Sequence, residues 1–166
     1  MTERLPEGVS FWSPPALIAT WFGSGLLPKI PGTWGSLAAV PVAWLIHDHL
    51  GAAGVAAAAV VAFAAGLWAC RELAARGLGG DPGVIVIDEV AGQLLTLSIV
   101  APDLLFYVTG FALFRFFDIL KPWPVDWAQQ RFQGPLGVML DDVLAAVYAG
   151  AGLWFIQWYS AVGHVS

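Results

Sequence analysis

The sequence predicts an all-α, membrane-associated helical bundle of about five to six helices, within a single domain that covers residues 1–166. The first observation is composition: 58% of the residues are hydrophobic and 11% are charged, against about 45–50% and about 25% in ordinary globular proteins. The mean hydropathy is +0.74. So few charges would cover a water-facing surface poorly, which favours a protein that faces lipid.

The second observation is that the charges are separated by long apolar runs. Two runs, 52–70 and 143–163, have the roughly 20 residues that a helix needs to cross a bilayer. Three shorter runs, 37–46, 90–101 and 104–117, would be short or tilted spans, or else buried helices of the bundle.

The third observation is where the charged residues fall if all five runs cross the membrane. This topology places all seven Lys and Arg residues on one side, as expected for the cytoplasmic side. It also gathers polar residues from separate segments on that face, which favours one polar site at the cytoplasmic end: Lys29, Asp88, Glu89, Asp118, Lys121, Asp141 and Asp142. In the alternative, the short runs do not cross.

Several classes of protein are disfavoured. The net charge of −5, with no basic arm or stripe, gives no sign of nucleic-acid binding. A single cysteine, Cys70, excludes an internal disulfide and a cysteine-based zinc site. Cys70 and Arg76 match the C-x5-R spacing of cysteine phosphatases, but CRELAAR favours a helix, so we expect an inert thiol. Residues 1–12 lack a long apolar segment, so no signal peptide is expected.

Acidic residues are concentrated in three segments at the edges of apolar runs. They are IDEVAGQ (Asp88, Glu89), FRFFDILKPWP (Asp118) and GVMLDDVLAA (Asp141, Asp142). An ionised carboxylate in such a place is costly unless it is paired or bound to a cation. Oxygen ligands without histidine or thiolate suit Mg²⁺, Ca²⁺ or Mn²⁺. The pattern therefore predicts a metal site built from carboxylates.

Two of these segments carry further local expectations. Arg115, Asp118 and Lys121 follow one another at i, i+3 and i+6, along one side of a helix that the prolines of KPWP should end. Asp141 and Asp142 directly precede the last apolar run, so we expect them to cap its helix. Taken singly, each segment favours a local explanation: a surface salt bridge for Arg115 and Asp118, a helix cap for Asp141 and Asp142, and a solvated turn for Asp88 and Glu89. Together, and with Lys29 in the glycine- and proline-rich run, they favour a site.

The run GSGLLPKIPGTWGS, residues 23–36, is expected to be a loop because glycine and proline both interrupt regular structure. Thr33 or Ser36 would cap a helix that begins near Leu37. The free backbone N–H groups at that start, with Lys29 nearby, would form an anion site. The Walker A pattern of nucleotide-binding loops is absent.

Four segments resemble the phosphatidylglycerophosphatase A family: GSGLLPKIPGTWGSL (23–37), IDEVAGQ (87–93), FRFFDILKPWPVDW (114–127) and QGPLGVMLDDVLAAVYAG (133–150). The resemblance implies a Mg²⁺-dependent phosphatase that converts phosphatidylglycerophosphate to phosphatidylglycerol and phosphate in a bacterial inner membrane. It also implies a fold in which one central helix is surrounded by the others. The partners would be the phospholipid substrate and the membrane, and the oligomeric state is left open.

The resemblance and the residue pattern indicate the same catalytic group. Asp88, Glu89, Asp141 and Asp142 would bind the metal, and Asp118 would be a further ligand or would orient water. A metal ion held there would act as a Lewis acid and a template for attack by water. An aspartyl-phosphate intermediate is the alternative.

The phosphate oxygens would be held by five residues that carry charge or a hydroxyl group: Lys29, Thr33, Ser36, Arg115 and Lys121. Two other functions stay open. A phosphotransferase acting on a CDP-activated lipid would also use carboxylates at the membrane edge, but its Asp-Gly…Asp…Asp signature is missing. A small transporter subunit would place its polar residues near the midplane of the membrane.

Overall fold

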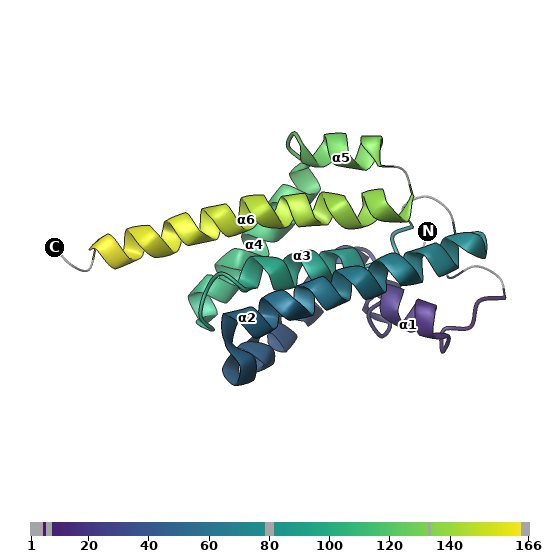
Figure 1. The fold of residues 1–166 in the computed structure, drawn as a ribbon, viewed down its shortest axis with the longest axis horizontal. Helices are drawn as coiled ribbons and strands as arrows, with labels where there is room; N and C mark the ends of the chain where they lie inside the picture. Colours follow the sequence, from purple (N-terminus) through teal and green to yellow (C-terminus); the bar gives the residue numbers. More distant parts are fainter. Residues whose placement is uncertain (1–4, 6–7, 79–81, 133, 164–166) are drawn as a thin grey trace.

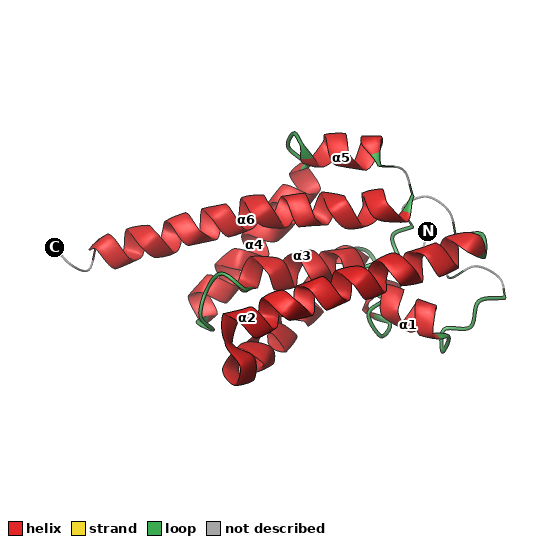
Figure 2. Ribbon diagram, viewed as in Figure 1, coloured by secondary structure: helices red, strands yellow, loops and turns green. Residues whose placement is uncertain are grey.

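In the computed structural model, the described residues are 5, 8–78, 82–132 and 134–163, and every regular element among them is helical (Figure 2). The prediction of an all-α fold is therefore confirmed. In chain order the elements are α1 (Pro14–Ala19), the 3-10 turn η1 (Ser24–Leu26), α2 (Pro31–Ala75), α3 (Ile87–Leu97), α4 (Leu104–Leu120), α5 (Val125–Arg131) and α6 (Pro135–Gly163).

Helix α3 is the centre of the bundle. It packs against α2, α4 and α6, and Figure 1 shows it between α2 and α6. Nine of its eleven residues are buried, which is typical of a helix enclosed on all sides. The expectation of a central helix surrounded by others is confirmed.

Helix α2 is divided at Gly51 into two arms. Gly51 has φ 68° and ψ −171°, a backbone conformation outside the helical region that glycine adopts readily. Gly35 on the first arm and Gly66 on the second both lie against the start of α3: an added Cβ would be 2.7 Å from Val86 Cβ and 2.9 Å from Ile87 Cγ2, respectively. Because both arms reach the same place, the chain doubles back at Gly51. Figure 1 shows α2 turning back on itself in its dark blue part.

Among the described residues, two helices, α2 and α6, are long and apolar enough to cross a membrane. The arms of α2, residues 31–50 and 52–75, would be about 30 Å and 36 Å long at the helical rise of about 1.5 Å per residue. These lengths match a hydrocarbon core of about 30 Å. Only 22% of the most apolar stretch of α2 is buried, so most of its apolar surface faces outward.

The start of α2 differs from the sequence prediction. The helix begins at Pro31 rather than near Leu37, so the second half of the glycine- and proline-rich run is helical. No side chain caps this start, and the expected cap by Thr33 or Ser36 is wrong. Proline suits the first helical position because its φ is already set and its missing N–H would have no helical partner there.

The start of α6 also differs. The helix begins at Pro135, six residues before Asp141, so Asp141 and Asp142 do not cap it. Gly134, at φ 76°, and Pro135 together supply the start signal. The two carboxylates are consequently carried inside the bundle, where both are buried.

The end of α4 agrees with the prolines of KPWP, since the helix stops at Leu120. Lys121 then takes a left-handed conformation with φ 46°. Arg115 and Asp118 therefore share one side of the helix, as predicted, whereas Lys121 lies beyond its end.

Gly92 is a point of close approach between α3 and its neighbours. A Cβ there would lie 2.6 Å from Phe114 Cε2 on α4 and 3.0 Å from the backbone oxygen of Asp142 on α6. Backbone atoms cannot move aside as a flexible side chain can. The absence of a side chain at this position therefore allows α6 to bring Asp142 against α3.

We expect Gly92→Ala to lower the midpoint of thermal unfolding, because overpacking of this kind costs about 1–3 kcal/mol. Gly152→Ala on α6 is the matched control. Its Cβ would lie 3.5 Å from Leu113 Cδ1, an ordinary contact, and alanine favours a helix over glycine by about 1 kcal/mol. Equal midpoints for the two variants would show that α3 and α6 are less tightly packed than described.

Candidate active site

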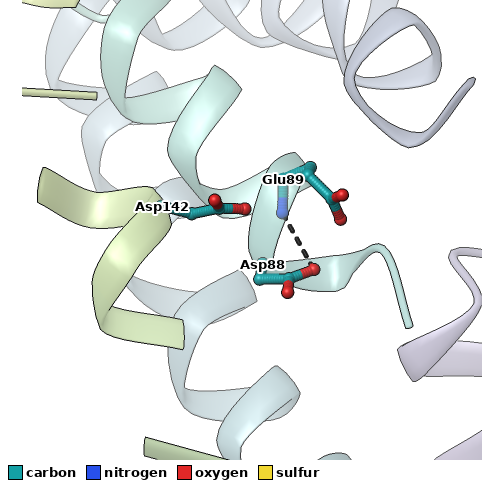
Figure 3. Close-up of side chains that lie close together, drawn as sticks. All are labelled: Asp88, Glu89 and Asp142. Carbon is teal, nitrogen blue, oxygen red and sulfur yellow. Dashed lines mark hydrogen bonds between the residues drawn. The ribbon is translucent and has the colours of Figure 1, made fainter. Parts of the chain in front are cut away.

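Three acidic side chains meet where α3 begins. Asp88 and Glu89 come from the first turn of α3, and Asp142 comes from α6 (Figure 3). One carboxylate oxygen from each lies within 4.8 Å of the others. The backbone N–H of Glu89 donates to Asp88 Oδ1 at 3.0 Å, which holds the Asp88 carboxylate in place. Two helices distant in sequence thus form one acidic group.

Two oxygens of this group are buried without a hydrogen-bond partner: Glu89 Oε2 and Asp142 Oδ2. A buried carboxylate oxygen that is left unpaired is costly. A divalent cation would satisfy both oxygens, and hard cations such as Mg²⁺ prefer oxygen ligands alone. Asp88, Glu89 and Asp142 therefore fit such an ion.

Asp118 and Arg115 extend the group from α4. Arg115 Nη1 lies 2.7 Å from Asp118 Oδ2 and 3.8 Å from Glu89 Oε1. It also donates to Ser36 Oγ at 3.3 Å. Asp118 is buried and lies close to Asp142. The guanidinium group is consequently held between the acidic group and the first arm of α2.

Asp141 is oriented differently from its neighbour Asp142. Lys121 Nζ donates to Asp141 Oδ2 at 2.7 Å, and the Asp141 side chain is almost fully buried. Burial lowers the pKa of Lys121, but the hydrogen bond to Asp141 and the nearby negative charges outweigh this and raise it. Lys121 therefore stays protonated, and Asp141 lies outside the group of three carboxylates.

The acidic charge of the site exceeds its basic charge. Burial is the main cause that raises the pKa of Glu89 from 4.5 to about 7, while its interactions with Asp88 and Arg115 partly oppose the rise. Five carboxylates share the region with two cations, Arg115 and Lys121. A bound divalent cation would favour the ionised carboxylates and restore the balance of charge.

A cavity of about 320 Å³ opens beside the acidic group, between the start of α2 and the end of α4. Glu89 and Arg115 line it together with Gly32 and Thr33 of the first turn of α2, whose backbone N–H groups precede the first hydrogen bond of the helix. A helix N-terminus beside a guanidinium group suits an anion. The lining residues are Ile30, Pro31, Gly32, Thr33, Gly83, Ile85, Glu89, Arg115 and Ile119.

The other residues predicted to hold phosphate occupy different places. Thr33 lines the cavity. Ser36 is buried, donates to Gly32 O at 2.9 Å and accepts from Arg115, so it supports the guanidinium group from behind. Lys29 is exposed, just before the cavity-lining Ile30, and forms no ion pair with the described carboxylates.

Gly32 is a residue of the site that sequence reasoning missed. A Cβ at Gly32 would collide with Glu89 Oε1 and would lie 3.3 Å from Arg115 Nη1. Its lack of a side chain lets Glu89 reach the cavity. One glycine among four in a run read as a loop carried no signal of this role.

The bundle combines a buried group of carboxylates, an adjoining cavity suited to an anion and two helices able to cross a membrane. These features are those of a membrane-associated enzyme that acts on an anionic substrate. Comparison with known proteins narrows this class. The family model of phosphatidylglycerophosphatase A matches residues 17–157. The chain therefore belongs to the phosphatidylglycerophosphatase A family.

Curated relatives agree over nearly the whole chain. Phosphatidylglycerophosphatase A of Haemophilus influenzae is 38% identical over 96% of this chain and 99% of the relative. The Escherichia coli protein of the same name is 36% identical over 90% and 87%. A putative phosphatidylinositol-3-phosphatase of Bacteroides thetaiotaomicron is 40% identical over 87% and 94%. No solved structure matches the chain.

Family membership makes the protein a phosphatase of phospholipid metabolism. The two apolar helices and the bacterial relatives together indicate a membrane protein.

We expect Lys121→Met to reduce the free energy of unfolding by about 1–3 kcal/mol, because it leaves the buried Asp141 carboxylate without its cation. The double variant Lys121→Met/Asp141→Asn also removes the carboxylate charge of Asp141 and should regain part of this loss. Denaturant titration of the wild type, both single variants and the double variant gives the coupling energy. Additive effects would show that the pair does not contribute to stability.

Proposed function

We propose that this protein is a Mg²⁺-dependent phosphatase that hydrolyses phosphatidylglycerophosphate to phosphatidylglycerol and inorganic phosphate. The observation that carries the proposal is the position of Asp88, Glu89 and Asp142, with two unpaired buried oxygens, beside the cavity that contains Arg115. The names of the family and of two relatives support the choice of substrate.

Asp88, Glu89 and Asp142 would hold the metal ion, and Asp141 remains a further candidate through its place beside Asp142. When bound, Mg²⁺ would supply Lewis-acid catalysis and would neutralise charge on the phosphate oxygens.

The phosphate group would occupy the cavity. Arg115, the first turn of α2 and Thr33 would bind its oxygens there. Lys29 and Lys121 would add positive charge from the surroundings, and Ser36 would keep Arg115 in position.

The reaction would replace the bond from phosphorus to the ester oxygen by a bond from phosphorus to the oxygen of a water molecule. A water oxygen attacks phosphorus, and the bond from phosphorus to the glycerol oxygen breaks. One proton of the water passes to the leaving glycerol oxygen, which becomes an alcohol, and the other stays on the released hydrogen phosphate. Asp118 is the candidate for orienting the water, because it lies beside both Arg115 and Asp142. Attack by a carboxylate, through an aspartyl-phosphate, is the alternative.

The proposed location is a bacterial inner membrane with the site facing the cytoplasm. The crossing topology places every Lys and Arg on the side of the acidic group. Along α6, Asp142 and Trp158 are sixteen residues apart, about 24 Å of helix. Trp158 and Tyr159 are exposed, as aromatic residues at the opposite membrane surface would be. The acidic group would then lie near one surface.

A second phospholipid has to be compared with phosphatidylglycerophosphate as the substrate. The Bacteroides relative is named for a phosphorylated inositol lipid. The lipids in that name and in the family name both carry a phosphate monoester on a glycerophospholipid, and they differ in the headgroup. The family model and two relatives favour phosphatidylglycerophosphate.

The test is phosphate release by the purified full-length chain in detergent micelles. We expect release from phosphatidylglycerophosphate with Mg²⁺, loss of activity with EDTA and recovery when excess Mg²⁺ is added. Phosphatidylinositol 3-phosphate serves as the comparison lipid and should be a poor substrate. Activity that survives exhaustive chelation would contradict the metal mechanism, and a preference for the inositol lipid would contradict the substrate.

We expect Asp88→Asn and Asp142→Asn each to lower kcat by at least about 10²-fold. Replacing even a residue that hydrogen-bonds to a metal ligand lowers metal affinity or activity about 10- to 100-fold. Asp48→Asn is the control, because it removes the same charge from an exposed position near Gly51, away from the acidic group. Equal activity of all three variants would place the metal elsewhere. Circular dichroism would verify that each variant stays folded.

A further inference from the structure

The cavity beside the acidic group has two chemically different sides. Glu89 and Arg115 form its polar side. Ile30 and Ile119 also line it, and they are 51% and 71% exposed. A pocket for a small, water-soluble phosphate ester would gain little from such exposed apolar side chains at its opening.

Apolar side chains continue away from the opening along both helices. On α4, Phe116 lies one turn before Ile119 and is 56% exposed. On α2, Leu37 lies one turn after Thr33 and is also exposed. Ile30, Leu37, Phe116 and Ile119 are named here the apolar rim. It begins in the cavity and extends over the outside of the bundle.

We propose that the apolar rim binds the diacylglycerol part of the substrate lipid while the phosphate group occupies the cavity. This inference rests on the proposed function. The order of these surfaces matches the order of groups in the lipid. The phosphate group would lie at Arg115 and the start of α2, and the acyl chains would lie over the isoleucine, leucine and phenylalanine side chains. The substrate would enter sideways from the membrane, between the first arm of α2 and the end of α4.

A second apolar groove, of about 230 Å³, does not meet this requirement. It is lined from α3 by Ala91 and Leu95. Ala91 follows Glu89 by two residues, about 200° around the helix, so the groove lies on the side of α3 away from Glu89 and the phosphate cavity. Of these two apolar surfaces, the apolar rim is the one that is continuous with the cavity.

The first experiment compares two phosphatidylglycerophosphates, one with oleoyl chains in mixed micelles and one with water-soluble butanoyl chains. We expect Ile119→Asn to raise KM for the oleoyl lipid at least about tenfold, since burying a side chain of this size contributes at least that factor. The rise in KM should be clearly smaller for the butanoyl lipid, because its short chains cover less of the apolar rim while its phosphate group occupies the same cavity.

Leu120→Asn is the matched control. Leu120 is the next residue on α4 and is 59% exposed, but it does not line the cavity. The KM of the Leu120→Asn variant for the oleoyl lipid should stay at the wild-type value. Equal effects of the two substitutions, or an equal loss on both lipids in Ile119→Asn, would overturn the assignment of the rim.

A measurement without turnover separates this proposal from the proposed function. A phosphatidylglycerophosphate with a photoreactive acyl chain is crosslinked to the wild type in the presence of EDTA. We expect labelling within residues 116–119 that excess phosphatidylglycerophosphate removes and phosphatidylcholine does not. Such labelling, combined with no phosphate release from the same lipid in a parallel assay with Mg²⁺, would support the rim and contradict the phosphatase activity. Labelling that neither lipid reduces would reflect general contact with lipid and would overturn the proposal.

Discussion

The structure depends on the burial of carboxylates inside an apolar helical bundle. Asp88, Asp118, Asp141 and Asp142 are all buried, in a chain with few charges to offset them. Burial of an unpaired carboxylate is among the most costly arrangements in a protein. The starts of α2 and α3, the end of α4 and the first turns of α6 must therefore meet, so that basic side chains, backbone N–H groups and a cation can stabilise this charge.

Close packing of backbones makes that meeting possible. Gly32 leaves room for the Glu89 carboxylate, Gly66 for Ile87 and Met139, and Gly92 for the backbone of Asp142. These three glycines lie in helices, where glycine is unfavourable by about 1 kcal/mol relative to alanine. The gain is a set of carboxylates held on rigid helices, which position functional groups more accurately than loops do.

The separation of polar and apolar surfaces connects this packing to the function. Five carboxylates and the basic groups of Arg115 and Lys121 gather at one site, while the outward surfaces of α2 and α6 are largely apolar. A phosphorylated lipid has the same division, with its charge at one end and its chains at the other. The names of the relatives refer to a glycerol lipid and an inositol lipid, which differ in the headgroup.

The sequence alone determined the helical class, the three acidic segments and the family, because hydropathy, charge and motif spacing are properties of the chain itself. It misplaced the starts of α2 and α6, since proline and glycine are typical both of loops and of the first helical turn. Only the tertiary structure decided that Asp142 joins Asp88 and Glu89 while Asp141 pairs with Lys121. Adjacent residues on a helix point about 100° apart, so which one faces the site depends on how the helices pack.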